Sequence, residues 1–273
     1  MAQLISHNGE ILNQADFNLA VGNRAISFGD GFFESCLFKQ SECKLWLYHL
    51  KRINTALNAL CMENTEQELK LFDDVVKLLC NSGLENASAR VKITFYRNGF
   101  GTYTPQVSTY SYFITATLFA DTQFLAAPIH CDFAQKVYVN SNGFNFKSLS
   151  ALNYVLASIE KQNRQLDDLL LHNENGQLTE ATSSNLWWYN GKAIYTPHAK
   201  CGGVNGVFKA YLLDVLNDEG IDVLQGAFKP EDILAAHEVF LTNAVQGIRP
   251  VERVKNIYYK TQMTLYLIDK CSF

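Results

Sequence analysis

The segment that decides the fold is centred on a lysine and begins Phe146-Lys147-Ser148-Leu149-Ser150-Ala151-Leu152. Apolar residues recur along it at helical spacing, which predicts a helix over residues 148–163. Lys147 stands where the irregular stretch 140–143 changes into that helix. On its own Lys147 also fits a solvated lysine in a first helical turn, so its meaning depends on two later segments.

The two later segments supply an acid and the beginning of a second helix. Glu180 follows Leu178-Thr179 at the end of an expected strand, and Val207 and Phe208 open an expected helix over residues 207–219. The first amides of a helix have no partner inside it and favour a phosphate group. A nucleophilic lysine, an acid that keeps a pyridine nitrogen protonated, and a phosphate-binding helix start are the parts needed to hold pyridoxal phosphate.

Each of these residues also has a purely structural interpretation. Glu180 fits a surface acid beside a turn, and Asn205 fits the N-cap of the second helix. Arg52 fits either a solvent-facing helix arginine or a bidentate partner for the phosphate. Only the order and spacing of the residues together favour a cofactor site.

Hydrophobic periodicity predicts two domains. An Asn8-Gly9 hairpin, a helix through Leu50 and a second helix that ends near Gly83 indicate a small α+β domain over residues 1–119. Its expected strands are 32–38, 90–95 and 110–118, and the apolar face of its second helix is expected to be Leu69, Phe72, Val76 and Leu79. Residues 120–128 are expected to be a linker. A larger domain over 129–273 has expected short strands at 169–171, 186–189, 193–195, 223–224 and 239–241.

Composition limits the classes of function. Residues are 48% hydrophobic and 18% charged, and the net charge is −4, which argues against a broad nucleic-acid surface. No stretch reaches about 18 consecutive apolar residues, so neither a membrane span nor a signal peptide is expected. The seven cysteines are scattered without a CxxC pair, which predicts no metal site and favours reduced thiols in the cytoplasm.

The motifs together resemble the fold-type IV pyridoxal-phosphate enzymes, also called class IV aminotransferases. The resemblance covers nearly the whole chain and rests on Phe28-Gly29-Asp30-Gly31-Phe32-Phe33-Glu34, His49-Leu50-Lys51-Arg52, Lys147-Ser148-Leu149, Thr179-Glu180, Ser184-Asn185-Leu186, Val204-Asn205-Gly206-Val207 and Thr242-Asn243-Ala244. It implies a small α+β N-terminal domain, a larger barrel-like C-terminal domain, a cofactor in the cleft between them, and a homodimer.

The resemblance also implies roles for particular residues. Lys147 becomes the Schiff-base lysine and general acid–base, and Glu180 becomes the partner of the pyridine nitrogen. The implied phosphate and cofactor contacts are Arg52, Val207, Phe208, Asn243 and Ala244. The substrate is a small amino-acid-like molecule, and its expected neighbours are Phe33, Arg97 and Tyr103.

Three functions fit the sequence. The first is the lyase that converts 4-amino-4-deoxychorismate to p-aminobenzoate and pyruvate, because Phe208 and Ala244 stand where aminotransferases of this group usually carry threonine, and Phe33 where D-amino-acid aminotransferases carry tyrosine. One departure is that Thr102 stands where the lyase has arginine before glycine and tyrosine. The second is an aminotransferase for branched-chain or D-amino acids. The third, a non-catalytic cofactor-binding protein, is disfavoured by the intact pair of Lys147 and Glu180.

Overall fold

The structure is a computed structural model, and it describes residues 3–63, 68–120, 129–141 and 143–271. The chain divides into two compact units, residues 1–121 with 146–150 and residues 122–145 with 151–273. The expected boundary placed residues 146–150 in the second domain, whereas their contacts place them in the first unit. Most of the expected linker, residues 121–128, lies outside the described residues, so its nature stays a prediction.

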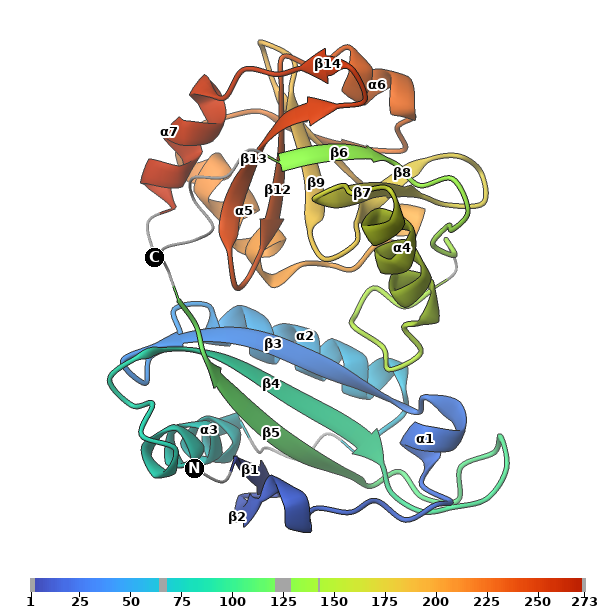
Figure 1. Cartoon of the computed structure of the whole chain (residues 1–273), viewed down its shortest axis with the longest axis vertical. Coiled ribbons are helices and arrows are strands. Elements are labelled where there is room, and N and C mark those ends of the chain that lie inside the picture. The colour runs from blue at the N-terminus through green and yellow to red at the C-terminus, as the bar shows by residue number, and fades with distance from the viewer. Residues whose placement is uncertain (1–2, 64–67, 121–128, 142, 272–273) are drawn as a thin grey trace. The chain divides into compact units, whose positions relative to one another are not determined.

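The first unit is an antiparallel sheet with helices packed on it (Figure 1). The strand order is β2-β1-β5-β4-β3, with bounds Leu4–His7 (β1), Glu10–Asn13 (β2), Gly31–Lys39 (β3), Ser88–Arg97 (β4) and Tyr110–Leu118 (β5). The helices are α1 (Arg24–Phe28), α2 (Trp46–Ala59) and α3 (Glu68–Asn81), and a 3-10 turn, η1, spans Gln14–Asp16. Helix α2 contacts β3, and α3 contacts β1 and β5. The expected hairpin is confirmed, with Asn8 and Gly9 at positive φ between β1 and β2.

Helix α3 buries a face one step away from the predicted one. Its buried apolar residues include Leu71, Val75, Leu78 and Leu79, so Leu79 is buried as predicted, whereas Phe72 and Val76 are half-buried. The side chain of Leu69, also predicted for this face, lies outside the described part of the chain. Helix α2 buries polar residues as well as apolar ones, because His49, Arg52, Ile53 and Ala56 share one face at helical spacing. Arg52 therefore points inward, and its interpretation as a solvent-facing arginine is wrong.

The second unit is a curved mixed sheet of nine strands. The order is β11-β10-β9-β12-β13-β6-β7-β8, with β14 paired to β13, and the bounds are Ile129–Phe133 (β6), Asp168–His172 (β7), Leu178–Ala181 (β8), Asn185–Tyr189 (β9), Ile194–Pro197 (β10), Val223–Gly226 (β11), Glu238–Asn243 (β12), Gly247–Val254 (β13) and Ile257–Tyr258 (β14). Strand β8, at one end of this order, also contacts β9 and β10. The sheet thus curls toward a half-barrel, as the expected barrel-like domain requires.

Four α-helices and a 3-10 turn accompany this sheet. They are α4 (Leu152–Asn163), η3 (Ala199–Cys201), α5 (Val207–Asp218), α6 (Pro230–Leu234) and α7 (Gln262–Lys270). The expected helix at 207–219 is confirmed. Strands β6 and β13 were not predicted; they pair in parallel with each other, a contact that local sequence does not encode. No helix in the described part of the chain is both long and apolar enough to span a membrane.

Lys147 does not open a helix. Residues 146–150 are a non-helical segment with bends and one isolated bridge to β3: the Phe33 amide donates to the Lys147 carbonyl at 2.8 Å, and the Leu149 amide donates to the Gly31 carbonyl at 3.0 Å. A Cβ on Gly31 would lie 2.2 Å from the Phe95 carbonyl oxygen, so the close approach of β3 to β4 at this position requires glycine. Helix α4 starts only at Leu152, because pairing with β3 outcompetes the helical periodicity before it.

Candidate active site

The candidate lysine is held on a non-helical segment beside β3. Phe146 is buried against Phe32, with ring centroids 5.9 Å apart, and this contact anchors the segment. The next residue, Lys147, points to the other side and is half-buried, with its Nζ 5.6 Å from the centroid of the Phe33 ring. The first unit therefore brings together two of the predicted residues, Lys147 and Phe33. A second amine, Lys92 Nζ, lies 4.6 Å from the same ring.

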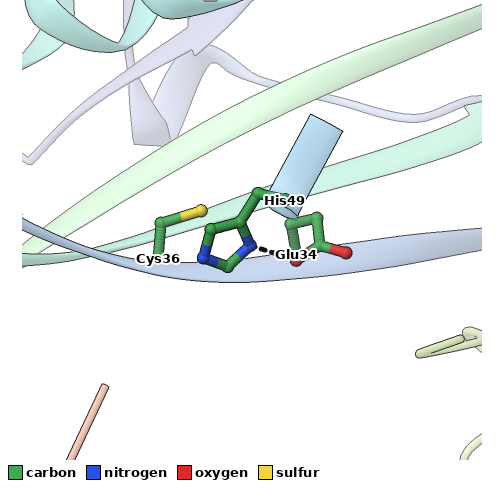
Figure 2. Close-up of side chains that lie close together, drawn as sticks. All are labelled: Glu34, Cys36 and His49. Carbon is green, nitrogen blue, oxygen red and sulfur yellow. Dashed lines mark hydrogen bonds and ion pairs between the residues drawn. The ribbon is translucent and has the colours of Figure 1, made fainter. Parts of the chain in front are cut away.

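Beneath this segment the first unit buries a cluster of charges, formed by Glu34 on β3 and by His49 and Arg52 on α2. Arg52 donates from Nε to Glu34 Oε1 and from Nη2 to Oε2, both at 2.7 Å. His49 Nδ1 lies 2.7 Å from Oε2 (Figure 2). The predicted bidentate fork of Arg52 exists, but its partner is Glu34, and neither Glu34 nor His49 was expected from the sequence to matter.

The protonation states in this cluster follow from burial and charge. Burial raises the pKa of Glu34, but the charge of Arg52 and hydrogen bonds from His49 and Arg52 outweigh it and lower the pKa to about 2. Burial lowers the pKa of His49, against the opposing effect of Glu34. A carboxylate only accepts hydrogen bonds, so neutral His49 must donate from Nδ1. Its Nε2 is buried with no hydrogen-bond partner in the described part of the chain.

These shifts predict that acid destabilises the first unit. Both pKa values lie below those of the unfolded chain, so the unfolded state binds protons more readily and stability falls as pH falls. The His49 contribution is lost below about pH 6.5. The Glu34 contribution, about 3 kcal/mol at neutral pH, is lost between about pH 4.5 and 2. Urea unfolding at pH 7, 5 and 4 measures the effect, and an equal acid sensitivity in Glu34→Gln would contradict it.

The same cluster contains the one group of possible metal ligands in the described residues. Ligand atoms of Glu34, Cys36 and His49 lie within 4.8 Å of one another, and Figure 2 shows the His49 ring between the other two side chains. However, both oxygens of the Glu34 carboxylate already accept a hydrogen bond from Arg52, and the positive charge of Arg52 repels a cation. The arrangement therefore favours an internal ion pair over a metal site.

Arg97 has structural partners that argue against a contact with substrate. It is buried, and its Nε donates to Asp30 Oδ2 at 3.0 Å, while its other nitrogens donate to the backbone carbonyls of residues 60, 61 and 107. Arg24 donates to the same Asp30 oxygen at 2.7 Å. Tyr103, by contrast, is 87% exposed. We therefore withdraw Arg97 from the substrate candidates, and Tyr103 stays a prediction.

In the second unit Glu180 is fixed at the end of β8. It is 4% exposed, and its Oε1 accepts a hydrogen bond from the Tyr154 hydroxyl at 2.5 Å and from the Val204 amide at 3.0 Å. Burial and the nearby carboxylate raise the pKa of Tyr154 far above its usual value, so the phenol keeps its proton and donates. Glu180 is thus a buried, oriented acceptor, and its interpretation as a surface acid is wrong.

The helix start at Val207 is tightly built. The N-cap is Gly206, not Asn205, and glycine has no side chain with which to cap the helix. A Cβ on Gly206 would lie 1.7 Å from Asn185 Oδ1, so only glycine fits there. Val207 and Phe208 are buried at 2% and 1% exposed. An uncapped first turn presents backbone N–H groups and the positive end of the helix dipole, which suits a phosphate.

Lys209, in the same first turn, is a residue that sequence reasoning missed. It is 5% exposed, donates to the Pro197 carbonyl at 2.6 Å, and lies 5.7 Å from the Trp187 ring centroid. Burial lowers its pKa to about 8, while the charge of Glu180 opposes this shift. A buried cation in a helix first turn is unfavourable unless anions lie near it. Its position directly after Val207-Phe208 was the available sequence signal.

Asn243 shapes the turn that follows β12. Its Nδ2 donates to Ser184 Oγ and Gln246 Oε1, both at 3.0 Å, and its Oδ1 accepts from the amides of residues 245 and 246. Ala244 stands inside this turn and is half-buried. The structure thus gathers the predicted residues into two groups: Lys147, Phe33 and Arg52 in the first unit, and Glu180, Val207, Phe208, Asn243 and Ala244 in the second.

The first unit thus holds the predicted lysine, and the second unit holds the buried carboxylate of Glu180 and the helix start at Val207. Residues 31–254 match the family model for amino-transferase class IV, so the chain belongs to that family. It is a pyridoxal-phosphate-dependent enzyme of fold type IV. The residues present fit this cofactor, since Glu180 is a buried carboxylate held by hydrogen bonds from Tyr154 and Val204, and α5 begins after a glycine N-cap.

Relatives with two activities are similar over most of the chain. Aminodeoxychorismate lyase of Bacillus subtilis is 25% identical over 95% of this chain and 89% of its own length. A putative branched-chain-amino-acid aminotransferase of Methanocaldococcus jannaschii is 23% identical over 89% of this chain and 85% of its own. The crystal structure of branched-chain aminotransferase from Thermoproteus uzoniensis superposes with a TM-score of 0.89 at 16% identity, covering 98% of this chain and 93% of that one. This last likeness shows the fold alone.

Proposed function

We propose that the chain converts 4-amino-4-deoxychorismate to p-aminobenzoate and pyruvate. The observation that carries this choice is Phe208 in the first turn of α5, with Ala244 beyond β12, where the aminotransferases of this group usually carry threonine. Phe208 is 1% exposed and packs edge-on against Tyr211, with centroids 5.6 Å apart. Each missing hydroxyl removes a phosphate bond worth about 1.5–3 kcal/mol. The similarity to the lyase of Bacillus subtilis supports the same choice.

Lys147 is proposed to bind the cofactor covalently and to move the proton. The backbone of Lys147 is bonded to β3, and its half-buried side chain places the amine 5.6 Å from the centroid of the Phe33 ring. In the lyase reaction the Lys147 amine removes the proton from the amine-bearing ring carbon of the substrate. The neighbouring ether C–O bond then breaks with its electrons going to the oxygen, and the ring becomes aromatic. The leaving enolpyruvate takes up a proton and becomes pyruvate. Bound pyridoxal phosphate supplies the electron sink for this bond breaking.

Glu180 and the helix start are proposed to hold the two ends of the cofactor. Glu180 accepts the pyridine N–H, and its Tyr154 and Val204 contacts fix the direction of that bond. The amides of Val207 and Phe208 donate to the phosphate, and the Asn243 turn with Ala244 lies beside it. Arg52 offers its guanidinium to the same phosphate while Glu34 holds its Nε and Nη2.

The alternative is an aminotransferase for branched-chain or D-amino acids. It is favoured by the similarity to the archaeal aminotransferase, which spans most of both chains. Lys147 would then move the proton from the α-carbon of the amino acid to the adjoining carbon of the cofactor, so that the amino group could pass to a 2-oxo acid. The residues described above serve both reactions, so the distinction rests on substrates.

An assay with two substrate sets separates these functions. The full chain with pyridoxal phosphate is supplied with aminodeoxychorismate, or with branched-chain or D-amino acids and 2-oxoglutarate. We expect p-aminobenzoate from the first set and at least about 100-fold slower glutamate formation from the second, because a site that hydrogen-bonds one substrate strongly rejects a substrate that lacks the matching groups. Glutamate without p-aminobenzoate rejects the lyase and supports the aminotransferase.

The chain is further proposed to form a homodimer in the cytoplasm. Helix α4 exposes an apolar stripe at i, i+3, i+4 and i+7, where Leu152 is 66%, Val155 52%, Leu156 44% and Ile159 48% exposed. Such a stripe on a helix is suited to a second copy of the chain. The scattered cysteines agree with a reducing compartment, and cell fractionation tests the location.

Light scattering tests the homodimer. We expect a mass of about twice 30.8 kDa for the unmodified chain. Changing Leu156 to glutamate is expected to shift the mass toward one copy, since a buried unpaired charge is costly at an interface. The matched control is Gln162→Glu, an exposed polar position on the same helix. A single-copy mass for the unmodified chain, or no difference between the two variants, would count against the proposal.

A further inference from the structure

We propose that Glu34 and His49 are positioning residues, which fix the guanidinium of Arg52 in the orientation that binds the phosphate of pyridoxal phosphate. The inference rests on the proposed function, because it names how that site holds its phosphate. Neither residue is proposed to touch the cofactor. Both act through the side chain of Arg52.

The first step is the geometry of the fork. Two parallel N–H···O bonds of 2.7 Å join Arg52 to the two oxygens of Glu34. A guanidinium is planar and rigid, so two bonds on one edge fix both the plane and the direction of the opposite edge. A single bond would leave the side chain free to rotate. Glu34 therefore determines the orientation of the Arg52 guanidinium.

The second step is that His49 fixes Glu34 in turn. His49 Nδ1 lies 2.7 Å from Oε2, the same oxygen that receives Arg52 Nη2. The His49 ring is 0% exposed and stands between Glu34 and Cys36, so it cannot swing away (Figure 2). The carboxylate plane is thus set from two sides. Loss of the Nδ1–H donor would let the carboxylate turn and would loosen the fork.

The third step is the change in solvent exposure along the cluster. The exposed fraction rises from 0% at His49 to 1% at Glu34 and 8% at Arg52. Around it lies an apolar core that includes Phe32, Leu50 and Ile53. Apolar residues in place of such a buried ionic group are often neutral or stabilising. Stability alone therefore does not explain why charged residues stand here in place of apolar ones.

The charges that face His49 support a fixed, uncharged ring. Arg52 and Lys147 are positive and Glu34 is negative, and burial together with the two cations disfavours a second proton on the ring. A neutral His49 leaves one net positive and one net negative charge in the fork. The role of the cluster is therefore orientation, rather than extra positive charge for the phosphate.

The test compares two replacements of His49. In asparagine the amide nitrogen matches Nδ1 of histidine, so His49→Asn retains the donor to Glu34. In glutamine the amide nitrogen matches Nε2, so His49→Gln removes that donor. The probes are pyridoxal phosphate and pyridoxal, which lacks the phosphate, titrated into the full apo chain. Urea unfolding of each variant reports stability separately.

We expect His49→Gln to weaken the binding of pyridoxal phosphate about tenfold, the effect of losing one charge-assisted hydrogen bond. The affinity for pyridoxal is expected to change by less than about twofold. His49→Asn is expected to stay within about threefold of the unmodified chain for both ligands. In an Arg52→Ala background, His49→Gln is expected to have no further effect on the preference for pyridoxal phosphate over pyridoxal, because His49 is proposed to act through the Arg52 side chain.

Other outcomes overturn the inference in distinguishable ways. Equal weakening of both ligands by His49→Gln indicates a merely structural role. If His49→Gln leaves the affinity for both ligands unchanged, the coupling to Arg52 is refuted while the proposed function stays intact. An unmodified chain that binds neither ligand refutes the proposed function itself. Stoichiometric Zn²⁺ binding to the unmodified chain that His49→Asn abolishes would show a metal site in place of a positioning cluster.

Discussion

Replacing Lys147 with alanine is expected to abolish covalent attachment of pyridoxal phosphate and to lower the rate of product formation by more than the ~10²–10⁴-fold that one general acid–base supplies. The amine is proposed both to bind the cofactor and to move the substrate proton, and alanine does neither. Borohydride treatment followed by peptide mass spectrometry measures attachment, and p-aminobenzoate release measures the rate. The fold is expected to survive, because the segment pairs with β3 through its backbone and is anchored by Phe146.

The chain offers a matched control for this substitution. Lys92 also places its Nζ near the Phe33 ring, at 4.6 Å against 5.6 Å for Lys147. Lys92→Ala therefore removes an amine from the other side of the same ring without removing the proposed nucleophile. We expect full attachment and a rate within about twofold, as for an ordinary surface substitution. Attachment that persists in Lys147→Ala and vanishes in Lys92→Ala would show that Lys92, and not Lys147, binds the cofactor.

Replacing Glu180 with glutamine is expected to lower the rate about 10²–10³-fold, the typical loss when one preorganised electrostatic contact is removed. Glutamine has nearly the same shape and can still accept from Tyr154 and from the Val204 amide. It carries no negative charge, so it cannot keep a pyridine nitrogen protonated, and the electron sink weakens. Steady-state rates at saturating cofactor measure the effect, and titration of the apo chain reports affinity.

The control is a second buried carboxylate of the same unit. Glu238 is 3% exposed, and it accepts hydrogen bonds from the amides of Met263 and Thr264 at the start of α7. Glu238→Gln therefore repeats the loss of a buried charge at a place with no proposed role in chemistry. We expect it to reduce stability by about 1–3 kcal/mol and to leave the rate nearly unchanged. A Glu180→Gln protein with an unaltered rate would exclude the proposed ring contact.

Much of the architecture follows from local sequence patterns. The Asn8-Gly9 turn, the alternation before Phe95 and the helix at 207–219 are encoded within a few residues of where they occur. Strand β6 escaped prediction because its parallel pairing joins residues 129–131 to 251–254, a contact across the whole second unit. Strand β13 also forms a local antiparallel hairpin with β12, so distance along the chain does not explain why it was not predicted. The periodicity after Lys147 misled for a related reason, since pairing with β3 is a non-local interaction.

The identities of Lys147 and Glu180, and their place among the motifs, were determined by the sequence alone and led to the enzyme class that the family match shows. The tertiary structure decided what their neighbours do. In the folded chain Arg52 points inward and bonds to Glu34, and Arg97 bonds to Asp30 and to backbone carbonyls. Lys209 is buried in the second unit. The physical reason is that residue type fixes which chemistry a side chain can perform, whereas burial, charge pairing and orientation arise only when distant segments pack together.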